Sequence, residues 1–232
     1  MNAGPPEPNL AAQLYQGASG RQYHEHKRAL DPRALEWVMR LRAAKLRPNV
    51  CAEDVVFELG VGAGWNLGRL QCARRIGSDT AAFLEERVTA LGIEFVSDIS
   101  LVADAAADVA ICHQTLEHLL EPAEALRQLK RVIKPGGKLI LHVPWERERR
   151  YRRYVPDEPN HHLYNWNAQN LGNLAAILGF KIQSLEVRRY GYDRFAANLA
   201  ARLRLGESGF RLLRACLIAL RPLREVELIA TR

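Results

Sequence analysis

The chain has 232 residues, of which 48% are hydrophobic and 25% charged, a composition typical of folded rather than disordered proteins. This length suits one α/β domain with additions, because two independent cores would each be small. The net charge of +7 favours anionic partners, whether phosphate, acidic glycan, nucleic acid or a membrane surface. The four cysteines contain no C-x-x-C pair, so neither a zinc knuckle nor a dithiol redox site is indicated.

The start of the chain carries no apolar run that resembles a signal peptide. The longest apolar segment, 212–220, is interrupted by Arg214 and is too short to span a bilayer. We therefore expect a cytoplasmic protein with at most a peripheral membrane contact, through residues 209–224.

Residues 1–50 are expected to form a tail and a helical lid, ahead of a main domain at 51–232. Three prolines lie in the first nine residues, and Asp31 with Pro32 predicts the start of a helix. The segment 21–29, RQYHEHKRA, gathers histidine, tyrosine and basic residues. It either touches a ligand from the lid or is a solvated helical face.

The segment 55–67, VVFELGVGAGWNL, predicts a buried strand that ends in a glycine-rich loop. Glycines at such a turn permit positive φ and close approach of a ligand, and a helix expected over 65–74 would offer amide donors. The loop therefore predicts a nucleotide or nucleoside site, with a purely structural turn as the alternative. A dinucleotide fingerprint would need glycine at position 65, where Trp65 stands, which disfavours pyrophosphate binding.

Asp79 lies nineteen positions after Gly60, where a doubly wound fold places an acid against ribose hydroxyls. Alternatively, Asp79 or Thr80 caps the helix predicted over 81–91.

The third strand, predicted over 93–96, is followed by Ser97 and Asp98. Either residue would meet an adenine base at that edge, or Asp98 is only a turn residue.

The run 108–144, DVAICHQTLEHLLEPAEALRQLKRVIKPGGKLILHVP, contains a fourth strand at 108–112, an LEHL element, a helix from Pro122 and a KPGG turn before a fifth strand at 138–143. With the glycine loop, residues 54–144 resemble the small-molecule class I S-adenosylmethionine-dependent methyltransferases of types 11 and 23. The resemblance implies an α/β fold: a single Rossmann-like, doubly wound, mostly parallel seven-stranded sheet with helices on both faces.

The resemblance also implies S-adenosylmethionine as cofactor, with the glycine loop behind its methionine and ribose. The expected cofactor-binding residues are Glu58, Gly60, Val61, Gly62, Gly64, Asp79, Thr80, Ser97, Asp98, His113 and Leu116.

The residues after the fourth strand, Cys112 to Thr115, depart from two related patterns. Enzymes that methylate base amino groups carry Asp, Asn or Ser followed by Pro-Pro and an aromatic residue there, so DNA is not expected as a partner. Catechol-type transfer needs clustered Asp and Asn ligands, which CHQT does not offer. We therefore expect no metal.

A hydroxyl acceptor must lose its proton near neutral pH, which suits histidine. The candidate catalytic residues are His162, His161 and His113, with His162 preferred because it precedes the apolar Leu163. His118 is expected to fix local structure and His142 to lie in the core. The basic loop at 145–159 either grips an anionic acceptor or is simply solvated.

A helix over 167–178 and strands over 180–187 and 225–231 complete the sheet, with a helical insertion at 193–223. Its helix at 209–220 is apolar except for Arg211 and Arg214. It packs on the core or on a second subunit of a homodimer, shapes an acceptor pocket, or rests on a membrane.

We expect an enzyme that methylates a small-molecule or glycan-type acceptor, at a hydroxyl oxygen. The alternatives are a non-catalytic adenosylmethionine-binding subunit that needs a partner, and a basic module associated with membrane or RNA.

Overall fold

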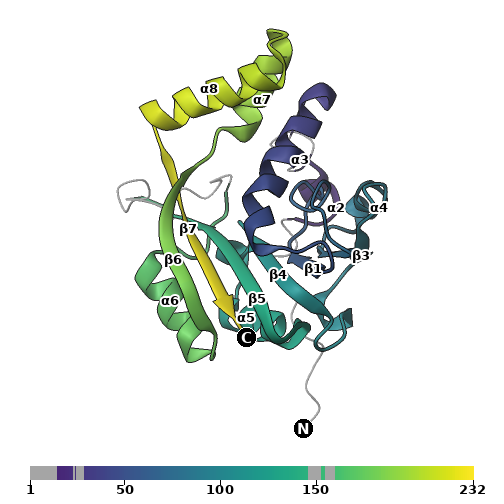
Figure 1. The fold of residues 1–232 in the computed structure, drawn as a ribbon, viewed down its shortest axis with the longest axis vertical. Coiled ribbons are helices and arrows are strands. Elements are labelled where there is room, and N and C mark those ends of the chain that lie inside the picture. Colours follow the sequence, from purple (N-terminus) through teal and green to yellow (C-terminus); the bar gives the residue numbers. More distant parts are fainter. Residues whose placement is uncertain (1–14, 23, 25–28, 146–152, 155–159) are drawn as a thin grey trace.

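A seven-stranded sheet with helices on both faces forms the domain (Figure 1). The computed structural model describes residues 15–22, 24, 29–145, 153–154 and 160–232. The strand order is β3-β2-β1-β4-β5-β7-β6, and only β7 runs opposite to the other strands of the sheet. The doubly wound, mostly parallel sheet is therefore confirmed. The strands are β1 (Val55–Leu59), β2 (Arg74–Ser78), β3 (Glu94–Val96), β4 (Ala107–His113), β5 (Ile133–Pro144), β6 (Lys181–Tyr190) and β7 (Leu223–Thr231).

Successive residues of the central strands supply two separate cores, because side chains alternate across a sheet. Phe57 of β1 packs into the larger core, under α5 (Pro122–Val132) and α6 (Ala168–Ile177). Val56 packs into the core on the other face, with Leu46 and Val88. These belong to α3 (Pro32–Leu46) and α4 (Glu85–Thr89). Both faces of the sheet are thus covered.

The ends of the main helices follow the local signals in the sequence. Asp31 caps α3 by accepting a hydrogen bond from the backbone N–H of Arg33 at 2.9 Å. Asn167 and Asn170 form a reciprocal capping box at the start of α6. Before α3 lies α2 (Gly17–Gln22), and single helical turns occur at η2 (Arg47–Asn49), η3 (Ala82–Leu84), η4 (Ile99–Leu101) and η5 (Leu116–His118).

The helix expected over 65–74 does not form. Residues 60–70 make successive turns instead, with Gly64 donating to the carbonyl of Val61 at 2.9 Å and Gly68 to that of Gly64 at 2.8 Å. Glycine is a poor helix former, and this segment carries it at 60, 62, 64 and 68. Met39 of α3 packs so closely that a Cβ on Gly68 would lie 2.8 Å from its sulfur. The N-terminal helix α3 therefore covers this part of the sheet.

The KPGG segment lies within β5 rather than ahead of it. Gly136 has a φ of +77°, and the pairing of β4 with β5 shifts register between Ala107 and Val109. The turn expected here is thus an irregularity at the start of a long strand.

The predicted insertion between β6 and β7 consists of α7 (Asp193–Arg202) and α8 (Gly206–Leu220). Phe210 and a stripe of alanines on α7 pack against Val38 and Met39 of α3, so packing onto the domain is observed for one face of α8. The other face is exposed, with Leu212 66% and Leu220 84% accessible. Within the described residues, no helix is both long enough and apolar enough to cross a bilayer.

Candidate active site

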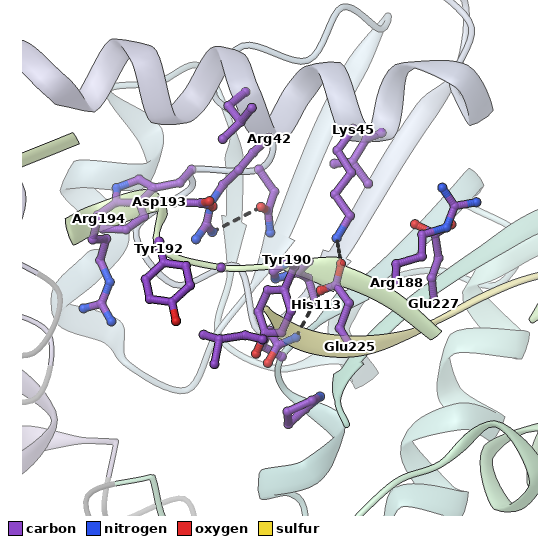
Figure 2. Close-up of a pocket in the computed structure, with 18 of the residues that line it drawn as sticks. Arg42, Lys45, His113, Arg188, Tyr190, Tyr192, Asp193, Arg194, Glu225 and Glu227 are labelled. Carbon is purple, nitrogen blue, oxygen red and sulfur yellow. Dashed lines mark hydrogen bonds and ion pairs between the residues drawn. The ribbon is translucent and has the colours of Figure 1, made fainter. Parts of the chain in front are cut away.

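A cavity of about 890 Å³ lies at the edge of the sheet where β1, β4 and β5 end and β7 begins. Ligands of open α/β sheets bind at this carboxyl edge, and the volume lies in the range of small-molecule sites. The walls come from the glycine loop, the segment after β4, the end of β6 and the start of α7. Helix α3 crosses one side, with Arg42 and Lys45 directed into the cavity (Figure 2).

Lys45 and Glu225 form an ion pair inside this cavity. The ammonium of Lys45 donates to the Glu225 carboxylate, whose side chain is only 1% exposed. Gln114, just after β4, donates to the other carboxylate oxygen at 3.4 Å. Burial is the main cause that lowers the pKa of Lys45, and the nearby carboxylates oppose it. The pair joins α3 to β7 across the cavity.

A second buried network lies beside it on β5, β6 and β7. His142 Nε2 is 2.9 Å from Glu227 Oε2, and Arg188 donates to Glu227 Oε1 at 2.7 Å. Burial lowers the pKa of His142, while the hydrogen bond with His142 lowers the pKa of Glu227. A neutral His142 imidazole that donates a hydrogen bond to an ionised Glu227 carboxylate accounts for the lowering of both pKa values.

The insertion is tied to α3 through Asp193 at the start of α7. Arg214 of α8 donates to one carboxylate oxygen at 2.6 Å, and Arg42 Nε lies 3.7 Å from the other. The Arg42 guanidinium also lies 5.3 Å from the ring centre of Trp65. These contacts link α3, the insertion and the glycine loop at the cavity wall.

The glycine loop takes the left-handed conformations expected of it. Gly60, Gly62 and Gly64 have φ values of +74°, +52° and +75°. A Cβ on Gly60 would lie 2.2 Å from Thr115 Oγ1, so this glycine is also required by packing against the segment after β4. Glu58 is fully buried and accepts a hydrogen bond from Asn66.

Of the predicted cofactor-binding residues, Gly60, Val61 and His113 line the cavity. The other predicted residues do not line it: they lie in or next to the glycine loop, after β4, or just after β2 and β3. Leu116 is buried in the larger core, and Thr80 and Ser97 are exposed at the ends of β2 and β3.

Asp98 makes the turn contact that was its alternative to ligand binding, whereas neither Asp79 nor Thr80 caps a helix, since η3 and α4 begin without a side-chain cap. Asp79 accepts from the backbone N–H groups of Gly62 at 2.8 Å and Ala81 at 2.9 Å. Asp98 accepts from Ser100 at 2.7 Å and begins η4. Their contacts with ribose and adenine stay predictions.

Two of the three candidate catalytic histidines, His113 and His162, line the cavity. His161 has a φ of +51° and presents its backbone carbonyl to His118 Nδ1 at 3.4 Å. His118, expected to fix local structure, also lines the cavity. His142 is 1% exposed, as expected for a core residue. Most of the basic loop and much of 21–29 lie outside the described residues.

Arg42, Lys45, Glu225 and Glu227 line the cavity and were not among the residues expected there. The sequence does indicate that Glu225 and Glu227 are unusual, because they alternate along a predicted strand whose other residues are largely apolar. Acids on one face of a buried strand require partners or a ligand. Nothing in the sequence distinguishes Arg42 and Lys45, since basic residues are ordinary on a helix surface.

Residues 21–185 match the model of a family described as "Methyltransferase domain". The chain belongs to this family: it is a class I methyltransferase domain, and its cofactor is S-adenosylmethionine.

A Mycolicibacterium smegmatis protein named a probable S-adenosylmethionine-dependent methyltransferase is 31% identical over 140 residues, 57% of this chain and 54% of that one. The chain spans about half the length of the curated relatives it matches.

Solved structures share the fold. The Burkholderia thailandensis 1,6-didemethyltoxoflavin-N1-methyltransferase, solved with its substrate and S-adenosylhomocysteine, superposes with a TM-score of 0.64 at 17% identity, covering 100% of this chain and 93% of that one. The [4+2]-cyclase SpnF has a TM-score of 0.60 at 22% identity, covering 84% and 80%. A cyclase on this fold means that function must be argued from the site.

The cavity contains a group suited to the cofactor. The indole N–H of Trp65 is buried at the wall and meets no hydrogen-bond acceptor among the described residues. Buried donors are normally satisfied. An acceptor on a bound ligand, such as the carboxylate of S-adenosylmethionine, would satisfy it.

Proposed function

We propose that this protein transfers the methyl group of S-adenosylmethionine to a hydroxyl oxygen of a small-molecule or glycan-type acceptor. The observation that carries the proposal is the single cavity that joins Gly60 and Val61 of the glycine loop to His113 and His162. A donor behind the loop and an acceptor against the histidines would face each other within that volume.

The bound cofactor supplies a methyl group already activated by its sulfonium. The protein's task is then to align the acceptor and to exclude water. Helix α3 and the insertion enclose the cavity through the Lys45–Glu225 and Arg214–Asp193 contacts. Both contacts lie at the wall, so they would hold this enclosure closed around an acceptor.

A hydroxyl acceptor must also lose its proton, and His113 or His162 is placed to accept it. Both side chains are partly accessible at the cavity wall. His161 does not line the cavity, which makes it the weaker of the three candidates.

The charge of the cavity favours an anionic acceptor. Its lining contains more cationic than anionic side chains, and Arg189 makes no ion pair with any described residue. A carboxylate or phosphate on the acceptor would suit such a guanidinium. The cations lining the cavity are Arg42, Lys45, Arg188, Arg189, Arg194 and Arg214, and the acids are Glu117, Asp193, Glu225 and Glu227.

The test is incubation of the purified protein with radiolabelled S-adenosylmethionine and small-molecule cell extract, followed by identification of the labelled product. We expect a labelled acceptor whose methyl is on oxygen. Binding of S-adenosylmethionine without turnover until a partner is added would favour the non-catalytic subunit. Salt-sensitive RNA binding without a labelled product would favour the basic module.

The exposed face of α8 supports a second proposal, a contact made through residues 209–224. Leu212 and Leu220 are largely accessible there, and exposed apolar side chains that cluster mark interaction surfaces. Light scattering would reveal a homodimer and liposome flotation a peripheral membrane contact. A monomer that does not float would reject both.

A further inference from the structure

Three metal-ligating side chains meet at the cavity wall, apart from the residues expected to hold the cofactor. One carboxylate oxygen of Glu117 and one ring nitrogen from each of His118 and His162 lie within 4.8 Å of one another. His118 Nε2 is 3.7 Å from Glu117 Oε1, and the two imidazole rings meet edge to face at 4.9 Å. All three residues line the cavity.

The fold holds this cluster by backbone bonds rather than by chance contact of long side chains. Glu117 and His118 belong to the helical turn η5 directly after β4. The carbonyl of Glu117 accepts hydrogen bonds from the backbone N–H groups of Leu163 at 2.8 Å and Tyr164 at 3.3 Å. These bonds fix the segment that carries His162 against η5, although it follows more than forty residues later.

The hydrogen bonds of His118 indicate which of its nitrogens faces the cluster. The carbonyl of His161 lies 3.4 Å from Nδ1, and the hydroxyl of Tyr15 lies 2.9 Å from it. The tautomer with the proton on Nδ1 satisfies this carbonyl, which can only accept, and leaves the lone pair on Nε2. Tyr15 in turn donates to the carbonyl of Asn160 at 3.3 Å. An outer hydrogen bond that orients a histidine in this way is typical of metal sites.

We propose that Glu117, His118 and His162 bind a divalent first-row transition-metal ion at the cavity wall. Two ligands about 2.1 Å from an ion lie roughly 3 Å apart at right angles and roughly 4.2 Å apart when opposite, so the observed 3.7 Å is compatible. Two imidazoles with one carboxylate suit such ions and leave coordination positions open. The expectation of no metal was based only on the residues Cys112 to Thr115. His162 lies far from Glu117 and His118 in the sequence, so it can join them as a ligand only in the folded protein.

The open positions would face the cavity, where an acceptor hydroxyl could coordinate and become more acidic. With His162 ligating the ion, His113 would be the residue that accepts the hydroxyl proton. This role rests on the proposed methyl transfer, whereas metal binding does not. The site is therefore tested with the metal alone.

The experiment is calorimetric titration of Zn²⁺ into the tag-free, chelator-treated full chain, with Co²⁺ absorption spectra as a structural probe. We expect one equivalent of Zn²⁺ to bind, and Co²⁺ bands that indicate nitrogen ligation. The isosteric Glu117→Gln and the substitution His162→Ala each remove a direct ligand, so each should weaken binding by at least the roughly 10- to 100-fold that loss of an outer partner costs. His161→Ala and His113→Ala serve as matched controls, because they remove histidines nearby but outside the cluster, and should bind as the wild type does.

The proposal is overturned if the wild type binds no Zn²⁺, or if Glu117→Gln and His162→Ala bind it as tightly as the wild type. Melting temperatures of the variants, measured without metal, identify any that fail to fold, and an unfolded Glu117→Gln leaves His162→Ala to decide. Metal binding without methyl transfer would reject the proposed function and leave the metal site intact. Full transfer in chelator, with Zn²⁺ binding retained, would reject only the role in the reaction.

Discussion

Lys45, in the last turn of α3, donates a hydrogen bond to the carboxylate of Glu225, 180 residues later on β7. The helix that covers the cavity is thus attached to the far half of the sheet. Because the Glu225 side chain is 1% exposed, loss of either partner leaves the other charge poorly solvated.

Replacing Glu225 by Gln should lower the free energy of unfolding by about 1–3 kcal/mol, because Lys45 stays partly buried beside an uncharged amide. Urea denaturation measures this change. The matched control is Glu94→Gln, which removes the exposed ion pair with Arg74 and should change stability by less than about 0.5 kcal/mol. Equal effects of the two substitutions would contradict the assigned importance of the buried pair.

The stability of the protein should rise with pH on the alkaline side. Burial lowers the pKa of Lys45 below its ordinary 10.5, so the unfolded chain binds more protons between the folded pKa and 10.5, and raising the pH favours the folded state. Urea denaturation across this range should show that slope in the wild type, and a smaller slope in Lys45→Met. An identical slope in Lys45→Met would show that other groups cause it.

A second pH dependence should appear on the acid side. The pKa of His142 is held below its ordinary 6.5 by burial, so unfolding takes up a proton and stability falls as the pH drops below about 6.5. The pKa of Glu227 is lowered from 4.5 and contributes only at still lower pH. Between pH 7 and 5, His142→Gln should therefore lose less stability than the wild type. An equal or greater loss in His142→Gln would argue against a neutral, buried imidazole.

Cofactor binding should depend on the glycine loop. Gly62→Trp places an indole at a φ of +52° and should weaken S-adenosylmethionine binding at least about tenfold, measured by calorimetry. Ser208→Trp, on the exposed surface of α8, controls for adding an indole elsewhere. Unchanged affinity in a folded Gly62→Trp would place the cofactor away from this loop.

Trp65→Phe separates packing from ligand binding. Because the indole N–H meets no acceptor among the described residues, its removal should change the free energy of unfolding by less than about 1 kcal/mol. If the cofactor accepts from this N–H, affinity for S-adenosylmethionine should fall about tenfold. Unchanged affinity would leave Trp65 a purely structural residue.

The sheet was predictable because its strands and helix caps are local signals. Val55 to Leu59 reads as a strand and Asn167 as a cap whatever surrounds them. The helix expected after Gly64 did not form in this glycine-rich segment. The contact that favours glycine at position 68 comes from Met39, on a helix earlier in the chain. Periodicity within a segment carries no information about such a neighbour.

The cavity was harder to predict for the same reason. His113 lies at the end of a strand and could be placed at the sheet edge, but Lys45 enters from a surface helix with no distinguishing pattern. The meeting of His162 with Glu117 depends on backbone bonds between segments far apart in sequence. Such proximity follows from topology, and a single sequence does not encode it in any short motif.

The bond between α3 and β7 has a consequence for the order in which the molecule assembles. Lys45 of α3 is synthesised 180 residues ahead of its partner Glu225, and only Glu227 follows Glu225 among the cavity's charged residues. Contacts between distant parts of a chain form late because they close long loops. During synthesis the central strands can pair, and the glycine loop can form, well before β7 supplies its side of the cavity. A cavity able to enclose ligand would therefore appear only as the C-terminal strand inserts between β5 and β6.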